Sequence, residues 1–95
     1  MSEKKLIKIP RTTLDFYKYE DGGITFYEFD ATDSCAPEPM MNALAALEMI
    51  KTKNERLVGT FFHEPTPLLQ RISKYFTHES TELENGDFRI VFEKI

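Results

Sequence analysis

Two proline-containing segments, each placed between a strand-forming run and an amphipathic run, constrain the fold of this chain most. They occupy residues 33–39 and 63–67. Proline fits the first turn of a helix, because the N–H that it lacks would have no partner there. Each segment is therefore expected to connect a strand to the helix that follows it, which gives the order strand, helix, strand, helix.

The runs that follow the two segments have the spacing of helices. The first helix is expected over residues 39–52, with Glu38 as its cap, and the second over residues 67–76, with Thr66 as its cap. Apolar side chains three and four positions apart form one buried face on each helix. In the first helix they are Met40, Ala43, Leu44, Leu47 and Ile50, with Asn42 outside this face, and in the second they are Leu69, Ile72 and Phe76.

Strand patterns occupy the rest of the chain. Residues 14–19 and 24–29 alternate around an Asp-Gly-Gly turn and predict a hairpin, while the nearly continuous apolar run 57–62 predicts a central strand. A C-terminal hairpin is expected around Asn85 and Gly86, with both residues at the centre of the turn and both at positive φ. Residues 1–12 are either a tail or a short edge strand, and they are expected to be dispensable for folding.

These elements predict an α+β two-layer sandwich. Because parallel crossovers are right-handed, the order β-α-β-α-β-β places both helices on one face of a four-stranded mixed sheet, with an N-terminal hairpin extension. The other face then has no helical layer, so exposed aromatic side chains there would indicate a partner or dimer surface.

Composition narrows the classes of partner and site. The net charge is -4 and the 12 basic residues are scattered, which argues against nucleic acid. No run reaches the about 18 apolar residues of a membrane span, and the first residues lack the apolar stretch of a signal peptide, so a cytoplasmic protein without membrane contact is expected. The single cysteine, Cys35, and the two histidines lack zinc-site spacing, and no glycine-rich phosphate loop is present, so neither metal nor cofactor is expected.

Both proline-containing segments resemble a known family. Cys35-Ala36-Pro37-Glu38-Pro39-Met40 resembles the C-P-x-P helix-opening motif of the TusA/SirA-like sulfur-carrier superfamily. The run that begins His63-Glu64-Pro65-Thr66-Pro67 resembles the segment that opens the second helix in an uncharacterised branch of that superfamily, whose members read roughly P-P-E-P-M at the first site. The resemblance implies a β-α-β-α-β-β domain over residues 24–95, preceded by an N-terminal extension over residues 1–23.

In the sulfur carriers, a cysteine directly before the first proline accepts a persulfide sulfur and passes it to a partner protein. Ala36 occupies that position here, and Cys35 lies one residue earlier. The resemblance therefore implies that Cys35 accepts sulfur only if the loop is shifted. The prolines match the motif, and their effect on the backbone does not need a thiol.

Three functions are compatible with this sequence, and none is catalytic. The preferred interpretation is a thiol-independent binding or adaptor module with a protein partner, and the first alternative is a sulfur carrier that uses Cys35. A second alternative is a small-ligand site in the groove between the two helix-opening loops. The candidate binding residues are Pro37, Glu38, Pro39, Met40, His63, Glu64, Pro65 and Pro67.

Overall fold

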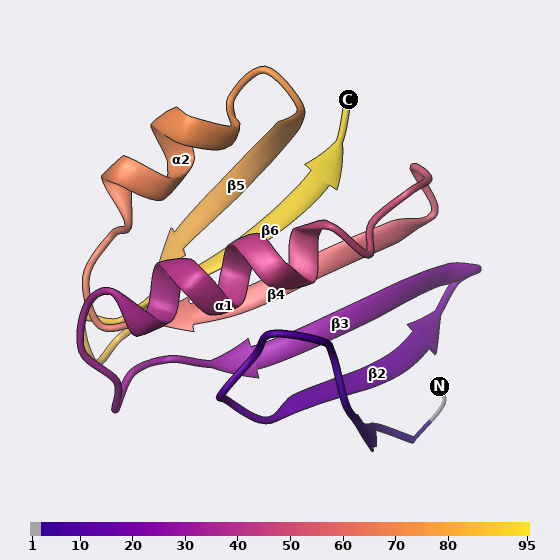
Figure 1. The fold of residues 1–95 in the computed structure, drawn as a ribbon, viewed down its shortest axis with the longest axis horizontal. Coiled ribbons are helices and arrows are strands. Elements are labelled where there is room, and N and C mark those ends of the chain that lie inside the picture. Colours follow the sequence, from indigo (N-terminus) through magenta and orange to yellow (C-terminus); the bar gives the residue numbers. More distant parts are fainter. Residues whose placement is uncertain (1–2) are drawn as a thin grey trace.

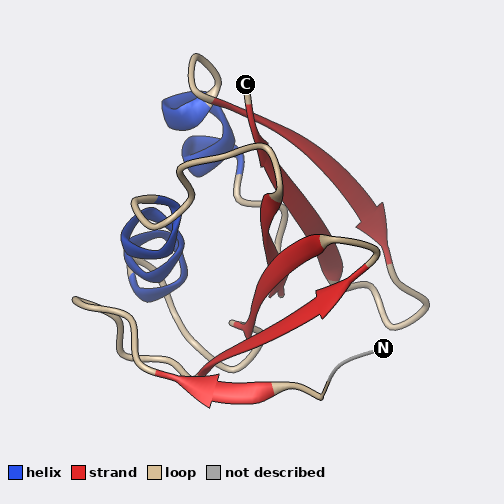
Figure 2. Ribbon diagram, turned by 90° about the vertical axis from the view of Figure 1, so that its right-hand side faces the viewer, coloured by secondary structure: helices blue, strands red, loops and turns tan. Residues whose placement is uncertain are grey.

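The computed structural model describes residues 3–95 and consists of one mixed sheet with two helices on one of its faces (Figures 1 and 2). The sheet has six strands in the order β1-β2-β3-β4-β6-β5, in which β3 and β4 are parallel and all other neighbours are antiparallel. The elements are β1 (Lys5–Ile7), β2 (Phe16–Asp21), β3 (Ile24–Asp30), α1 (Glu38–Leu47), β4 (Glu55–Phe61), α2 (Thr66–Ile72), β5 (Phe76–Glu82) and β6 (Phe88–Lys94).

The α+β class is confirmed, but the prediction of a four-stranded sheet is wrong. β2 pairs with β3 along its whole length, and β1 pairs with the outer edge of β2, so the N-terminal hairpin continues the sheet instead of standing apart from it. The turn between β2 and β3 consists of Gly22 and Gly23, with φ of 60° and 80°. Two residues at positive φ suit the twist of a two-residue hairpin, and this fixes β2 directly beside β3.

The C-terminal hairpin is present, but its turn differs from the prediction. The N–H of Gly86 donates to the carbonyl of Leu83 (2.9 Å), so Glu84 and Asn85 are the central residues. Gly86 has a φ of 90°, whereas Asn85 does not have a positive φ. This is the three-residue type of hairpin loop, in which the glycine follows the turn and forms a bulge.

Both helices begin one residue earlier than predicted. Pro37 is the N-cap of α1 and Pro65 that of α2, and neither helix has a side-chain cap, so Glu38 and Thr66 are the first helical residues. The first helix also ends at Leu47, before residue 52, and the second ends at Ile72, so Phe76 begins β5 and is not helical as predicted. Tighter bonds from residues 49 and 50 to the carbonyls three positions back continue the turn, which still brings Ile50 into the core.

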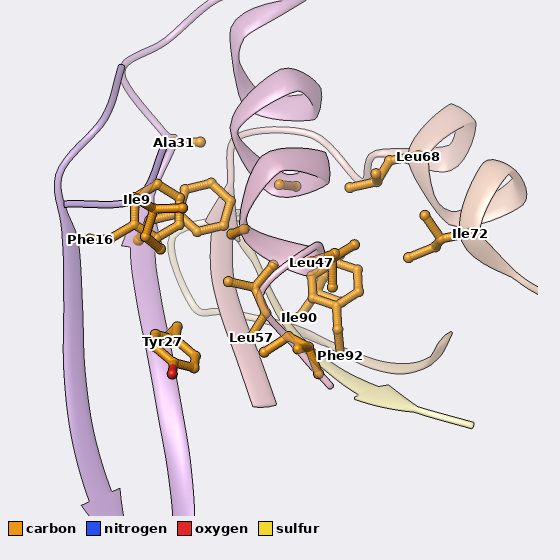
Figure 3. Packing of buried hydrophobic residues seen from close by; sticks show 14 of the residues in the cluster. Ile9, Phe16, Tyr27, Ala31, Leu47, Leu57, Leu68, Ile72, Ile90 and Phe92 are labelled. Atoms are coloured by element: carbon orange, nitrogen blue, oxygen red, sulfur yellow. The ribbon is translucent and has the colours of Figure 1, made fainter. Parts of the chain in front are cut away.

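The core lies between the helices and the sheet (Figure 3). The Phe16 and Phe29 rings stack with centroids 4.7 Å apart, and Phe29 meets Phe61 edge-on at 5.6 Å. β4 occupies the central position that its apolar run predicted, with β3 on one side and β6 on the other. The alternating residues Phe88, Ile90 and Phe92 of β6 all pack in or against this core.

Residues before β2 contribute to the core as well. β1 is an edge strand, which was one of the two alternatives for this segment, and Ile9 beyond it is only 5% exposed. Asn42 is 1% exposed, so its predicted place away from the buried face of α1 is wrong. It is buried because this N-terminal segment, which the helical periodicity does not take into account, covers that side of α1.

Candidate binding groove

The two proline-containing loops meet at one end of the sheet. β3 and β4 are parallel neighbours, with Asp30 beside Thr60, so the loops that leave their carboxyl ends emerge side by side. Between them lies a pocket of about 540 Å³, within the range of small-molecule and side-chain sites. It is lined by Ala31, Ser34, Cys35, Ala36, Pro37, Pro39, Met40, Phe61, Phe62, His63, Glu64, Pro65, Pro67 and Leu68.

The pocket has a rigid apolar floor and an exposed rim. Ala31, Phe61 and Leu68 are almost completely buried and belong to the core cluster, so the floor of the pocket is the outer surface of the core itself. Phe62, at the rim, is 59% exposed, and its ring lies 4.4 Å from that of His63. A partner group that enters the pocket would therefore be surrounded mainly by carbon atoms.

The starts of the two helices offer few N–H groups to a ligand. The N–H of Glu38 donates to the carbonyl of Cys35 (2.9 Å), and the N–H of Thr66 donates to that of Glu64 (2.9 Å). Pro39 and Pro67, the next residues, have no N–H. The free amides with which helix starts usually attract anions are thus largely lost at this pocket.

Glu64 is the acidic residue in the lining of the pocket, and neither Lys nor Arg lines it. Residues 30–37 and 62–65 contain Asp30, Asp33 and Glu64 and no Lys or Arg. Asp30 accepts bonds from the N–H and hydroxyl of Thr32, at 2.8 and 2.6 Å. Glu64 accepts a longer bond of 3.3 Å from the hydroxyl of Ser80.

The structure brings most of the predicted binding residues together. Pro37, Pro39 and Met40 from the first loop, together with His63, Glu64, Pro65 and Pro67 from the second, line the pocket. Glu38 does not, because its carboxylate accepts a bond of 2.5 Å from the hydroxyl of Thr13 in the N-terminal segment.

Sequence reasoning missed part of the apolar lining. Phe61 and Phe62 were predicted only as strand residues, and that prediction does not say that they contact the first loop. The available indication was Phe62, a bulky apolar residue that lies directly before the second loop.

Cys35 is exposed and lies on the wall of the same pocket. Its carbonyl accepts the N–H of Glu38, which holds the loop in a turn before α1, and the Ala36-Pro37 peptide bond is cis. Among residues 3–95, no group of three or more His, Cys, Asp or Glu side chains is placed to hold a metal ion. Within the same part of the chain, no helix is long and apolar enough to cross a membrane.

Comparison of the chain with protein-family models, with curated proteins and with solved structures finds no match.

Proposed function

We propose that this protein is a non-catalytic binding module, and that the groove between its two helix-opening loops receives an apolar group of a protein partner. The pocket of about 540 Å³ with a floor formed by core side chains is the observation that carries this proposal. Such a floor is already packed in the free protein, so little ordering would be needed on binding.

Two features favour a protein partner over a small molecule. Phe62 extends the apolar surface beyond the pocket mouth, and aromatic residues of this kind are enriched at protein interfaces. Pro37, Pro39, Pro65 and Pro67 stiffen both walls, which reduces the entropy that the loops would lose against a large ligand. The thiol of Cys35 is not needed for this kind of binding.

The test is selection of peptides from a random display library on the immobilised protein. We expect selected peptides to share large apolar residues and to lose about five-fold or more in affinity against Phe62→Ala, because an interface anchor contributes about 1 kcal/mol or more. Tyr75→Ala is the matched control, since Tyr75 is 63% exposed and lies outside the groove.

A second pair of variants tests whether α1 contributes to binding in the groove. Met40 lines the pocket, whereas its neighbour Met41 is 58% exposed and does not. Met40→Lys should abolish retention of the selected peptides and Met41→Lys should preserve it. Failure to select any peptide, or equal retention by all four variants, would contradict the proposed function.

The exposure of Cys35 in the same pocket favours sulfur transfer as a second candidate function. In this reaction the Cys35 thiolate attacks the outer sulfur of a donor persulfide, and a Cys35 persulfide forms as the donor leaves as a thiolate. Mass spectrometry after incubation with a persulfide-loaded desulfurase tests it, with Cys35→Ser as the control. One sulfur atom added to the protein and none added to the control would support sulfur transfer. If no sulfur is added to the protein, sulfur transfer is excluded and the thiol-independent binding module stands.

A further inference from the structure

We infer that the protein segment bound in this groove is basic, with Lys or Arg residues flanking the apolar anchor. The inference rests on the proposed function, and it adds the charge of the partner. It depends on the carboxylates of the two loops and on the scarcity of groups that would hold an anion.

The loop carboxylates have no cationic partner within residues 3–95. Ion pairs within residues 3–95 join Lys4 to Glu28, Arg11 to Glu48 and Arg56 to Glu93. None of them involves Asp30, Asp33 or Glu64. The charge of Glu64 in the pocket lining, and the charges of Asp33 in the first loop and of Asp30 at the end of β3, are therefore not neutralised by an ion pair within residues 3–95.

An acidic segment would find little to bind here. No Lys or Arg lines the pocket, and the N–H groups of Glu38 and Thr66 are already bonded. Bringing further carboxylates to the groove would add repulsion to the loss of their hydration. With a net charge of -4, the whole chain also favours approach of a positively charged partner.

A basic segment would gain binding free energy at the floor and at the rim of the same groove. An apolar side chain would fill the space above Ala31, Phe61 and Leu68, and flanking cations would lie near the exposed rim that includes Glu64. Because the rim is solvated, each such pair contributes modestly, and the apolar anchor supplies most of the affinity. Charge would decide which apolar segments are accepted.

The experiment compares three peptide sub-libraries that share random apolar central positions and differ only in flanking Lys, Gln or Glu. At low salt, we expect the full-length protein to retain the Lys set best and the Glu set least. At about 1 M salt, where the screening length falls to about 3 Å, the differences between the sets should largely disappear.

Glu64→Gln should reduce the preference for Lys over Gln by about two- to five-fold, as expected for one exposed ion pair. Glu79→Gln, on β5 and outside the groove, should leave the preference unchanged. Equal retention of all three sets at low salt, with binding still lost in Phe62→Ala, would overturn this inference while the binding function stands. Retention of none of the sets would overturn both.

Discussion

At the scale of single residues, the floor of the groove depends on a position without a side chain. A Cβ on Gly59 would lie 2.7 Å from Cε1 of Phe61 and 2.9 Å from Cε1 of Phe29. Both rings are buried, so neither can move freely away. We expect Gly59→Ala to lower the free energy of unfolding by about 1 to 3 kcal/mol, as overpacking does.

Urea unfolding of Gly59→Ala measures this loss. Thr60→Ala, at the next position on β4 and on the opposite face, is the control and should cost less, since strand propensity alone spans about 1 kcal/mol. A Gly59→Ala protein as stable as the parent would show that Phe29 and Phe61 have room to shift.

A second residue-scale prediction concerns Tyr19 on the helix-free face. Its ring stacks on Phe26 with centroids 5.1 Å apart, and Lys4 lies over it. Burial, followed by the hydrogen bond and charge of Glu28, raises the pKa of Tyr19 above its ordinary value, while Arg89 opposes this rise. Folding therefore favours the protonated phenol, and that contribution is present below about pH 10 and lost as pH rises through the folded-state pKa.

Tyr19→Phe should consequently lose less stability than the parent as the pH rises above about 10. Part of the loss of stability at alkaline pH should persist in Tyr19→Phe, because burial and then Glu55 also raise the pKa of Tyr27. Urea titrations across this range give the comparison. Identical pH dependence of the two proteins would mean that Tyr19 ionises alike in the folded and unfolded chains.

At the scale of elements, Asn42 joins α1 to the segment before β2. Its Oδ1 accepts the N–H groups of Thr13 (2.8 Å) and Leu14 (3.0 Å). Its Nδ2 donates to the hydroxyl of Thr13 and to the carbonyl of Glu38, both at 2.9 Å. One buried amide thus satisfies backbone groups of two elements that are distant in sequence.

Asn42→Ala should cost about 1 to 3 kcal/mol, because it leaves partly buried N–H groups without their acceptor. Asn42→Asp keeps the acceptor and loses the donors, so it separates the two halves of the interaction. Asn54→Ala, at an exposed position, is the control, and unfolding in urea is the measurement. A loss no larger than that of Asn54→Ala would show that water replaces the amide at Thr13 and Leu14.

Elements differ in how far the sequence predicts them. Periodicity located both helices and the strands around Leu57 and Ile90, because one face of each contacts the core. Periodicity placed Asn42 wrongly, because the spacing of apolar residues in a helix does not show which distant segments of the chain pack against that helix. The C-terminal turn also failed, since an Asn-Gly pair suits either the centre of a turn or its end, and the loop length decides.

The groove illustrates the same limit. Proline positions predicted where the two loops occur, and seven of the eight candidate binding residues line the pocket. Its floor could not be predicted, because Ala31 lies outside every predicted element, Phe61 belongs to a predicted strand, and Leu68 lies beside the predicted buried face of its helix. They form the floor only because β3 and β4 are parallel neighbours whose loops leave the sheet together.

At the scale of the whole molecule, the N-terminal residues belong to the same packed unit as the rest. Ile9, which is 5% exposed, lies in the core cluster near Phe16 (Figure 3), and β1 closes the outer edge of β2. Arg11 pairs with Glu48 at 2.6 Å, just beyond the end of α1. From these contacts we expect the segment to contribute to stability, although the sequence alone predicted that it is dispensable.

A chain that begins at Thr13 should be less stable than the full chain by more than the loss from Ile9→Ala alone. Removing a buried isoleucine side chain costs about 2 to 5 kcal/mol, and the truncation also removes the β1 ladder and the Arg11 pair. Because small domains are stable by only about 5 to 15 kcal/mol, the truncated chain should be at best marginally folded. Urea unfolding followed by circular dichroism measures all three proteins.

Leu6→Ala, at a β1 position that is 64% exposed, is the matched control and should cost under about 0.5 kcal/mol. If the truncated chain instead unfolds cooperatively at the same urea concentration as the full chain, residues 1–12 contribute no net stability, and the N-terminal boundary of the folding unit lies at or after Thr13.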